Sequence, residues 1–230
     1  MNIIFDMDGV IFDTEKMYLA CRVPAAEKFG LTGIEKVSYE CIGVTEPITE
    51  RKLRAFIGDD ALYEEFNRET ERIFKEIYET DGLALKEGVL ELLSYLKRIG
   101  AKTALASSTH SSTVKMELRD AGLLEYFDVV IGGEMAGASK PAPDIFLLAA
   151  EKLGVAIENG KIADGGIAER CCIIEDSFNG VRAAHASGAT VIMVPDMLEP
   201  TEEILALTDH VFDSLVDVQA WLESDMSEDQ

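Results

Sequence analysis

Two aspartates lie two residues apart directly after a short apolar run near the start of the chain. Asp6 and Asp8 follow residues 3–5, which are all large and apolar. A carboxylate can attack phosphorus and form an aspartyl-phosphate, which divides one difficult displacement into two easier steps. A second carboxyl group nearby can protonate the leaving oxygen and later activate water. The pair therefore favours phosphoryl transfer through a covalent intermediate.

Polar side chains that suit the same chemistry follow three further apolar runs. After the run at 102–106 come the hydroxyls of Ser107, Ser108 and Thr109. A short loop beyond the run at 128–132 leads to Lys140, and the run at 171–175 ends in Glu175, with Asp176 and Ser177 directly after it. In open α/β sheets, ligands bind beyond the carboxyl ends of the strands. We therefore expect these side chains to converge.

Crowded carboxylates are costly to bury without a cation to balance their charge. Hard oxygen ligands with open positions suit Mg²⁺, which keeps several waters and bridges to substrate phosphate. A lysine and hydroxyl groups can stabilise charge on the transferring phosphoryl group. The cluster therefore predicts Mg²⁺ as the cofactor.

Each of these residues also has a simpler explanation. Acids at a strand end are often turn residues, and the serines from 107 to 112 could cap the next helix. Lys140 could lie on the surface, and Glu175, Asp176 and Ser177 could merely begin a helix. The simpler explanations do not account for the joint occurrence at four strand ends.

The apolar runs and the segments between them predict the fold. Short apolar runs indicate buried parallel strands at 2–5, 102–106, 128–132, 171–175 and 190–194. Helical periodicity occurs in 87–99, 112–121, 143–153 and 178–187, and a glycine follows each segment as a stop signal. Such alternation is typical of a doubly wound, Rossmann-like α/β sheet.

The stretch at 15–82 breaks the alternation, because it contains helical periodicity and no convincing strand. Helices are indicated at 15–29, 47–57 and 60–79, with Pro24 expected to kink or break the first. We therefore predict a catalytic α/β core made of 1–14 and 83–230, and an inserted helical cap domain at 15–82.

Composition limits the partners and the compartment. The chain has 43 acidic and 21 basic residues and a formal charge of −22, which disfavours nucleic acid and anionic membranes as partners. We detect no apolar run long enough to span a membrane and no secretion signal. The four cysteines are interpreted as buried thiols in a reducing compartment. We therefore expect a cytoplasmic protein, as a monomer or weak dimer, with a frayed acidic end at 223–230.

Four segments, in order, resemble the motifs of the haloacid dehalogenase superfamily. The first is Asp6-Met7-Asp8-Gly9-Val10-Ile11-Phe12-Asp13-Thr14-Glu15, and the others are residues 105–108, 139–144 and 174–180. The helical insert is similar to the first cap class of that superfamily, and the closest branch resembles the beta-phosphoglucomutase-like group, which includes sugar-phosphate phosphatases.

The resemblance implies a role for each matching residue. Asp6 would be the nucleophile and a magnesium ligand, and Asp8 the general acid/base that gives its backbone carbonyl to the metal. Ser107 and Lys140 would hold the phosphoryl oxygens, with Ser108 beside them. Asp176 would complete the metal site, with Glu175 as a ligand or a second acid behind it.

Two departures from the mutase pattern favour a phosphatase. Tyr18 stands where the mutase carries a cap histidine, and Glu46 ends the Gly43-Val44-Thr45-Glu46 run where the mutase has a phosphate-binding arginine. A mutase must bind a second phosphate in the cap, and Glu46 would oppose that. The segment at 159–170 is longer than is usual in the beta-phosphoglucomutase-like branch, and we assign no function to it.

We therefore expect a Mg²⁺-dependent phosphomonoester hydrolase acting on a small metabolite such as a sugar or polyol phosphate. A sugar-phosphate mutase is the first alternative. Carbon–halogen hydrolysis needs neither a metal nor a leaving-group acid, so Asp8, Glu175 and Asp176 argue against it. A non-catalytic protein of the same fold would be expected to lose a motif residue. A phosphate-accepting receiver domain would leave the cap unexplained.

Overall fold

The computed structural model describes residues 1–42, 46–163 and 170–227, and it divides into two compact units. One unit comprises residues 1–12 and 85–230, and the other comprises residues 13–84. These boundaries differ by two residues from those expected from the sequence. No helix of the described residues is long and apolar enough to cross a membrane.

The first unit contains a six-stranded sheet in the order β3-β2-β1-β6-β7-β8. Every pair of neighbouring strands is parallel. The strands are β1 (Asn2–Phe5), β2 (Lys102–Ala106), β3 (Val129–Ile131), β6 (Cys171–Glu175), β7 (Thr190–Met193) and β8 (His210–Val211). The first five correspond to the five runs identified in the sequence. The edge strand β8 has only two residues and gave no sequence signal.

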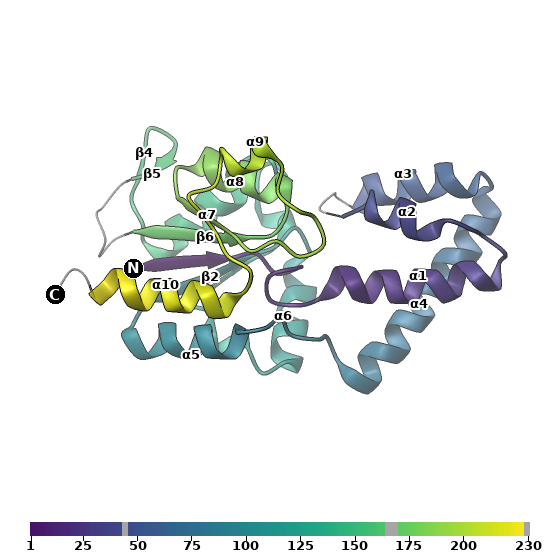
Figure 1. The fold of residues 1–230 in the computed structure, drawn as a ribbon, viewed down its shortest axis with the longest axis horizontal. Helices are drawn as coiled ribbons and strands as arrows, with labels where there is room; N and C mark the ends of the chain where they lie inside the picture. Colours follow the sequence, from purple (N-terminus) through teal and green to yellow (C-terminus); the bar gives the residue numbers. More distant parts are fainter. Residues whose placement is uncertain (43–45, 164–169, 228–230) are drawn as a thin grey trace. The chain divides into compact units, whose positions relative to one another are not determined.

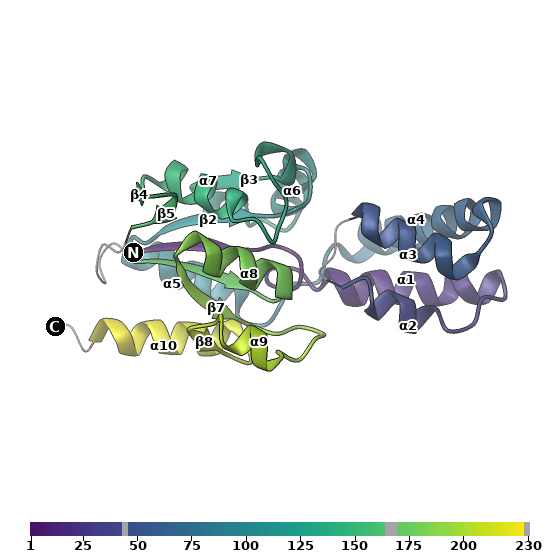
Figure 2. The same ribbon diagram turned by 90° about the horizontal axis from the view of Figure 1, so that it is seen from above.

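Helices cover both faces of this sheet (Figures 1 and 2). Helices α7 (Asp144–Leu153) and α8 (Phe178–Ser187) lie on one face, and α5 (Val89–Ile99) and α10 (Leu215–Ser227) lie on the other. Two further helices of this unit are α6 (Ser111–Asp120) and α9 (Glu202–Leu205). The arrangement confirms the doubly wound α/β fold.

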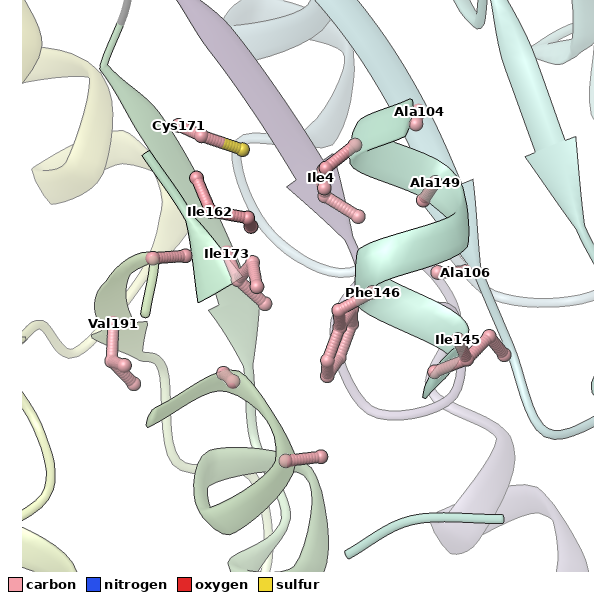
Figure 3. Close-up of a cluster of buried hydrophobic side chains, with 14 of the residues drawn as sticks. Ile4, Ala104, Ala106, Ile145, Phe146, Ala149, Ile162, Cys171, Ile173 and Val191 are labelled. Carbon is pink, nitrogen blue, oxygen red and sulfur yellow. The ribbon is translucent and has the colours of Figure 1, made fainter. Parts of the chain in front are cut away.

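The core between the sheet and α7 and α8 is built from side chains of alternating strand positions (Figure 3). Ile4 of β1 and Ile173 of β6 pack with Phe146 and Ala149 of α7, and all four are fully buried. Because both faces of a parallel sheet are covered, neighbouring residues within a strand, such as Ile3 and Ile4, are both apolar and buried. Ile3 and Phe5, on the opposite face, are buried as well.

The C-terminal segment differs from the expectation of a frayed end. Helix α10 extends to Ser227, and residues 228–230 lie outside the described part. Leu215, Val218 and Leu222 follow helical spacing and are buried, and α10 packs against α5. Burial of this apolar stripe stabilises the helix despite its acidic composition.

The unassigned segment at 159–170 is partly described. A small antiparallel hairpin joins β4 (Ile157–Glu158) to β5 (Lys161–Ile162). Residues 164–169 lie outside the described part. Ile162 is buried and belongs to the core beside α7 and α8, so the start of the segment has a packing role.

The second unit is entirely helical in its described residues. Its helices are α1 (Thr14–Lys28), α2 (Ile34–Tyr39), α3 (Glu46–Ile57) and α4 (Asp60–Asp81). The expected break at Pro24 does not occur, because α1 continues through it. Pro24 and Ala20 are exposed, so water can solvate the carbonyl that the proline leaves without a donor. Buried Ala25 and Ala26 hold the rest of the helix in this unit's own core.

Lys86 and Asp196 form a buried ion pair in the first unit. The Nζ of Lys86 lies 2.5 Å from Oδ1 of Asp196, and only 1% of the Asp196 side chain is exposed. The backbone amide of Lys86 also donates to the carbonyl of Ile11. The pair therefore links the loop after β1, through residue 86, to the loop after β7.

Replacing this lysine should destabilise the fold strongly. Lys86→Met leaves the Asp196 carboxylate buried without this cation, which typically costs about 3 kcal/mol, or a fall in Tm of roughly 6–12 °C for a chain of this size. Thermal unfolding followed by circular dichroism measures the effect. Lys75→Met is the control, because Lys75 pairs with Glu79 at an exposed site. Equal Tm changes in both variants would contradict the expectation.

Candidate active site

Asp6 and Asp8 lie in a tight turn directly after β1. The amide of Gly9 donates to the carbonyl of Phe12, and the amides of Ile11 and Phe12 donate to the carbonyl of Met7. Gly9 has a φ of +82°, and a Cβ atom there would lie 2.3 Å from Oδ2 of Asp176. Only glycine therefore suits this position, and its lack of a side chain lets the turn approach Asp176.

Lys140 connects two of the predicted carboxylates. Its Nζ lies 2.5 Å from Oδ1 of Asp6 and 2.6 Å from Oε1 of Glu175. The side chain is only 8% exposed, and Nζ lies 4.7 Å from the centre of the Phe146 ring. The lysine is therefore a buried residue of the cluster, and the surface alternative is wrong.

Asp6, Glu175 and Asp176 together offer a set of oxygens that could hold a metal ion. One carboxylate oxygen from each lies within 4.8 Å of the others, and all three residues are buried. Within the described chain, nothing donates a hydrogen bond to the buried Oδ1 of Asp176. A buried carboxylate oxygen without a hydrogen-bond donor, beside two further carboxylates, fits Mg²⁺, which prefers hard oxygen ligands. The Asp8 carboxylate is not part of this set.

Burial and mutual repulsion disfavour the charged forms of these acids. Burial raises the pKa of Asp6 to about 8, with Glu175 and Asp8 adding to the rise and Lys140 opposing it. Burial, followed by the charges of Glu175 and Asp6, raises the pKa of Asp176 well above its ordinary value. When all three are ionised, the carboxylates carry more negative charge than one lysine can balance, and a divalent cation would remove the imbalance.

Burial alone would lower the pKa of Lys140. The negative charges of Asp6 and Glu175 outweigh that effect and raise the pKa above the ordinary value for a lysine. Lys140 is therefore positively charged at neutral pH. A fixed ammonium group beside Asp6 can balance negative charge on a phosphoryl group.

Glu175 is held by its own loop. Its Oε2 accepts hydrogen bonds from the amides of Asp176 and Ser177 and from the Ser177 hydroxyl, at 3.0 to 3.1 Å. The other oxygen, Oε1, accepts from Lys140. Glu175 therefore orients the lysine and the residues that follow β6, whether or not it also binds an ion. Ser177 in turn caps α8, which confirms the simpler explanation for that one residue.

Two hydroxyl groups lie beside Asp8. Ser107 Oγ and Thr109 Oγ1 each lie 3.4 Å from its Oδ2, and the amide of Thr109 donates to Ser107 Oγ. Ser107 is buried, whereas Ser108 is exposed. The structure thus brings the hydroxyls of Ser107 and Thr109 to Asp8, whereas the side chain of Ser108, which the sequence nominated for substrate binding, is exposed. The run of hydroxyl residues after β2 indicated this part of the site, but the sequence alone does not determine which of these side chains face inward.

Glu117 on α6 interacts with the charge of Asp8, although no feature of the sequence indicated this residue. Burial, together with the charges of Asp8 and Asp120, raises the pKa of Glu117 to about 7. Its Oε2 is buried and accepts no hydrogen bond from the described residues. A glutamate within a helix carries no pattern that marks it as partly buried, so only the tertiary structure identifies this group.

Glu117 should make stability depend on pH. Its ordinary pKa is 4.5 and its folded pKa is about 7, so the folded protein holds this proton more strongly than the unfolded chain. Stability from this group is therefore greatest below pH 4.5 and declines as the pH rises to about 7. We expect Glu117→Gln to raise Tm at pH 8 by roughly 2–4 °C, equivalent to about 1 kcal/mol, and to have less effect at pH 4.5.

Differential scanning calorimetry at both pH values measures this difference. The control is Glu125→Gln, the same chemical change at an exposed site. A gain in Tm that does not depend on pH would show that ionisation of Glu117 does not destabilise the folded protein.

Comparison with known proteins identifies relatives over most of the chain. A family model described as haloacid dehalogenase-like hydrolase matches residues 1–188. The chain is 34% identical over 192 residues to a phosphorylated carbohydrates phosphatase of Thermotoga maritima. This alignment covers 81% of each protein. It is 31% identical to the protein CbbY of Cereibacter sphaeroides, over 94% of this chain and 93% of that one.

Solved structures show the same similarity. A candidate beta-phosphoglucomutase from Thermotoga maritima superposes with a TM-score of 0.76 and 29% identity, and covers 97% of this chain and 99% of its own. CbbY from Rhodobacter sphaeroides in complex with phosphate gives a TM-score of 0.69 and 26% identity, over 94% and 95% of the two chains. The similarity therefore extends through both units of the chain.

Proposed function

This chain belongs to the haloacid dehalogenase-like hydrolases, and we propose that within this family it is a Mg²⁺-dependent phosphatase of small phosphorylated carbohydrates or polyols. The observation that carries the proposal is the buried lysine that contacts both Asp6 and Glu175. Such a site combines a potential nucleophile with a fixed positive charge, as phosphoryl transfer requires.

The substrate class is supported by the relatives. One relative is named a phosphatase of phosphorylated carbohydrates, and another is named a glycerol-3-phosphatase. The net charge of −22 makes a local cation necessary for any anionic substrate. Lys140 supplies one such charge in this site, and a metal ion would supply the rest.

In the first step, a carboxylate oxygen of Asp6 attacks the phosphorus of the ester. A bond forms between this oxygen and phosphorus while the bond from phosphorus to the substrate oxygen breaks. Asp8 gives its proton to the leaving oxygen, so the alcohol departs neutral. Lys140 and the Ser107 hydroxyl hold the phosphoryl oxygens during the transfer.

In the second step, water releases the phosphate. Asp8, now ionised, takes a proton from a water molecule as the water oxygen attacks phosphorus. The bond between Asp6 and phosphorus breaks, which frees inorganic phosphate and restores both acids to their starting states. The hydroxyls of Ser107 and Thr109, which lie 3.4 Å from Asp8 Oδ2, can orient this carboxyl group for both transfers.

The residues that would hold Mg²⁺ are Asp6 and Asp176, with Glu175 close by and the backbone carbonyl of Asp8 implied by the resemblance. The ion, when bound, neutralises charge on the phosphoryl group and on the acids. The donors are oxygens, and the described residues include no histidine or cysteine in the cluster.

A mutase remains the second candidate, because a structurally similar protein is described as a candidate beta-phosphoglucomutase. The residues at 43–45, on which the cap comparison partly rested, lie outside the described part. Incubation with a hexose 1-phosphate, its bisphosphate and Mg²⁺ separates the two. Free phosphate supports the phosphatase, and an isomerised sugar phosphate supports the mutase.

Activity should depend on Mg²⁺. We expect excess EDTA to abolish phosphate release and added Mg²⁺ to restore it, because the acids need a cation to remain charged around the phosphoryl group. Ca²⁺ should inhibit, since it tolerates a looser geometry with more ligands. Phosphate release from a panel of sugar and polyol phosphates is the measurement. Undiminished turnover in EDTA would exclude the metal.

Substitutions should separate the roles of Asp6 and Asp8. Asp6→Asn should remove nearly all turnover, because an amide oxygen is a poor nucleophile. Asp8→Asn should slow turnover by ~10²–10⁴-fold, with a smaller loss for an aryl phosphate whose leaving group needs little protonation. Its phosphoenzyme should then accumulate, because no base activates water.

Mass spectrometry of the intact protein and of its peptides detects the added phosphoryl group. Asp81→Asn is the control, since it makes the same chemical change at an exposed site at the end of α4. Modification of a residue other than Asp6, or full activity of Asp6→Asn, would refute the assigned nucleophile.

A further inference from the structure

Glu134 holds the start of α6 through a hydrogen bond that the proposed reaction does not use. It lies in the 3-10 turn η2 (Gly133–Met135), which follows β3. Its two carboxylate oxygens lie 3.1 and 3.2 Å from the amide nitrogen of Ser111, the first residue of α6. Hydrogen bonding to Ser111 lowers the pKa of Glu134, so the group is ionised at neutral pH.

The backbone beside Glu134 holds the same loop at two more points. The amide of Gly133 donates to the carbonyl of Thr109 at 3.0 Å, and the amide of Ser107 donates to the carbonyl of Ile131 at 3.1 Å. A Cβ atom on Gly133 would lie 2.3 Å from the carbonyl oxygen of Ser108, so the two backbones are in direct contact.

The loop held in this way, residues 107–111, carries the hydroxyls that lie beside Asp8. Ser107 Oγ and Thr109 Oγ1 both contact Asp8 Oδ2, and the Thr109 amide donates to Ser107 Oγ. A shift of the loop would therefore move both hydroxyls together. Because phosphoryl transfer depends on geometry, a misplacement of 1 Å can cost ~10²-fold in rate.

We propose that Glu134 is a positioning residue for the phosphoryl-binding loop at 107–111. This inference rests on the proposed phosphatase function. The Glu134 carboxylate acts through Ser111 and the loop, and it sets where the hydroxyls of Ser107 and Thr109 stand relative to Asp8. Its negative charge suits the positive end of the α6 dipole, which explains why an acid occupies this place beside a site that binds anions.

Two variants separate position from charge. Glu134→Ala removes the hydrogen-bond acceptor, whereas Glu134→Gln keeps an acceptor oxygen and removes only the charge. We expect Glu134→Ala to raise the Ki of inorganic phosphate and the KM of an aryl phosphate by about tenfold, below the ~10²-fold of a full 1 Å misplacement. Glu134→Gln should stay within about threefold of wild type, because the loop keeps its anchor.

The matched control is Asp59→Ala in the other unit. The Asp59 carboxylate accepts from the amide of Leu62 and caps α4, so its loss also removes an acidic helix cap. A purely structural role for Glu134 predicts similar falls in Tm for both alanine variants, with the Ki of phosphate unchanged in each. A positioning role predicts a higher Ki in Glu134→Ala alone.

Three other outcomes would contradict either the positioning role or the phosphatase function. Tighter phosphate binding in both Glu134 variants would mean that the carboxylate only repels anions, and the proposal would fail. If wild type hydrolyses esters and Glu134→Ala matches it in Ki and KM, the phosphatase stands and the positioning role falls. If wild type hydrolyses none, the proposed function fails, and titration calorimetry of inorganic phosphate with Mg²⁺ decides the positioning role by the same comparison of variants.

Discussion

The contact between the Lys140 ammonium group and the carboxylates of Asp6 and Glu175 is the constraint on which the rest of the site depends. All three side chains are almost fully buried, where an unbalanced charge is costly. The lysine lies in the loop that precedes α7, whereas Asp6 follows β1 and Glu175 is the last residue of β6. Each element must therefore keep its register, because a small displacement would separate buried opposite charges. The surplus negative charge that remains, with Asp176 beside it, suits a divalent cation.

The parallel sheet makes this convergence possible. Because β1 pairs with both β2 and β6, the loops after all three strands emerge at one edge. Short backbone contacts then bring the loops close together. Gly9 leaves room for Asp176, and Gly133 lies against Ser108. The two glycines thus contribute to the geometry of the site, as the charged residues do.

The sequence predicted the regular elements well where burial produces a pattern. Five strands appear as continuous apolar runs, since both faces of a parallel sheet are covered. It failed where local signals and packing disagree. Helix α1 continues through Pro24, and α10 extends into an acidic segment, because buried faces stabilise both helices. The two-residue strand β8 is too short to produce periodicity.

By itself, the sequence determined where five of the strands lie along the chain, which polar groups stand at four of their ends and therefore the kind of chemistry. Those are properties of residue type and spacing along the chain. The tertiary structure decided which members face one another. It placed the hydroxyls of Ser107 and Thr109 beside Asp8 and left Ser108 exposed, and it brought Glu117 and Glu134 into the surroundings of the site. Such contacts depend on distances between segments far apart in the chain, and spacing along the chain carries no information about those distances.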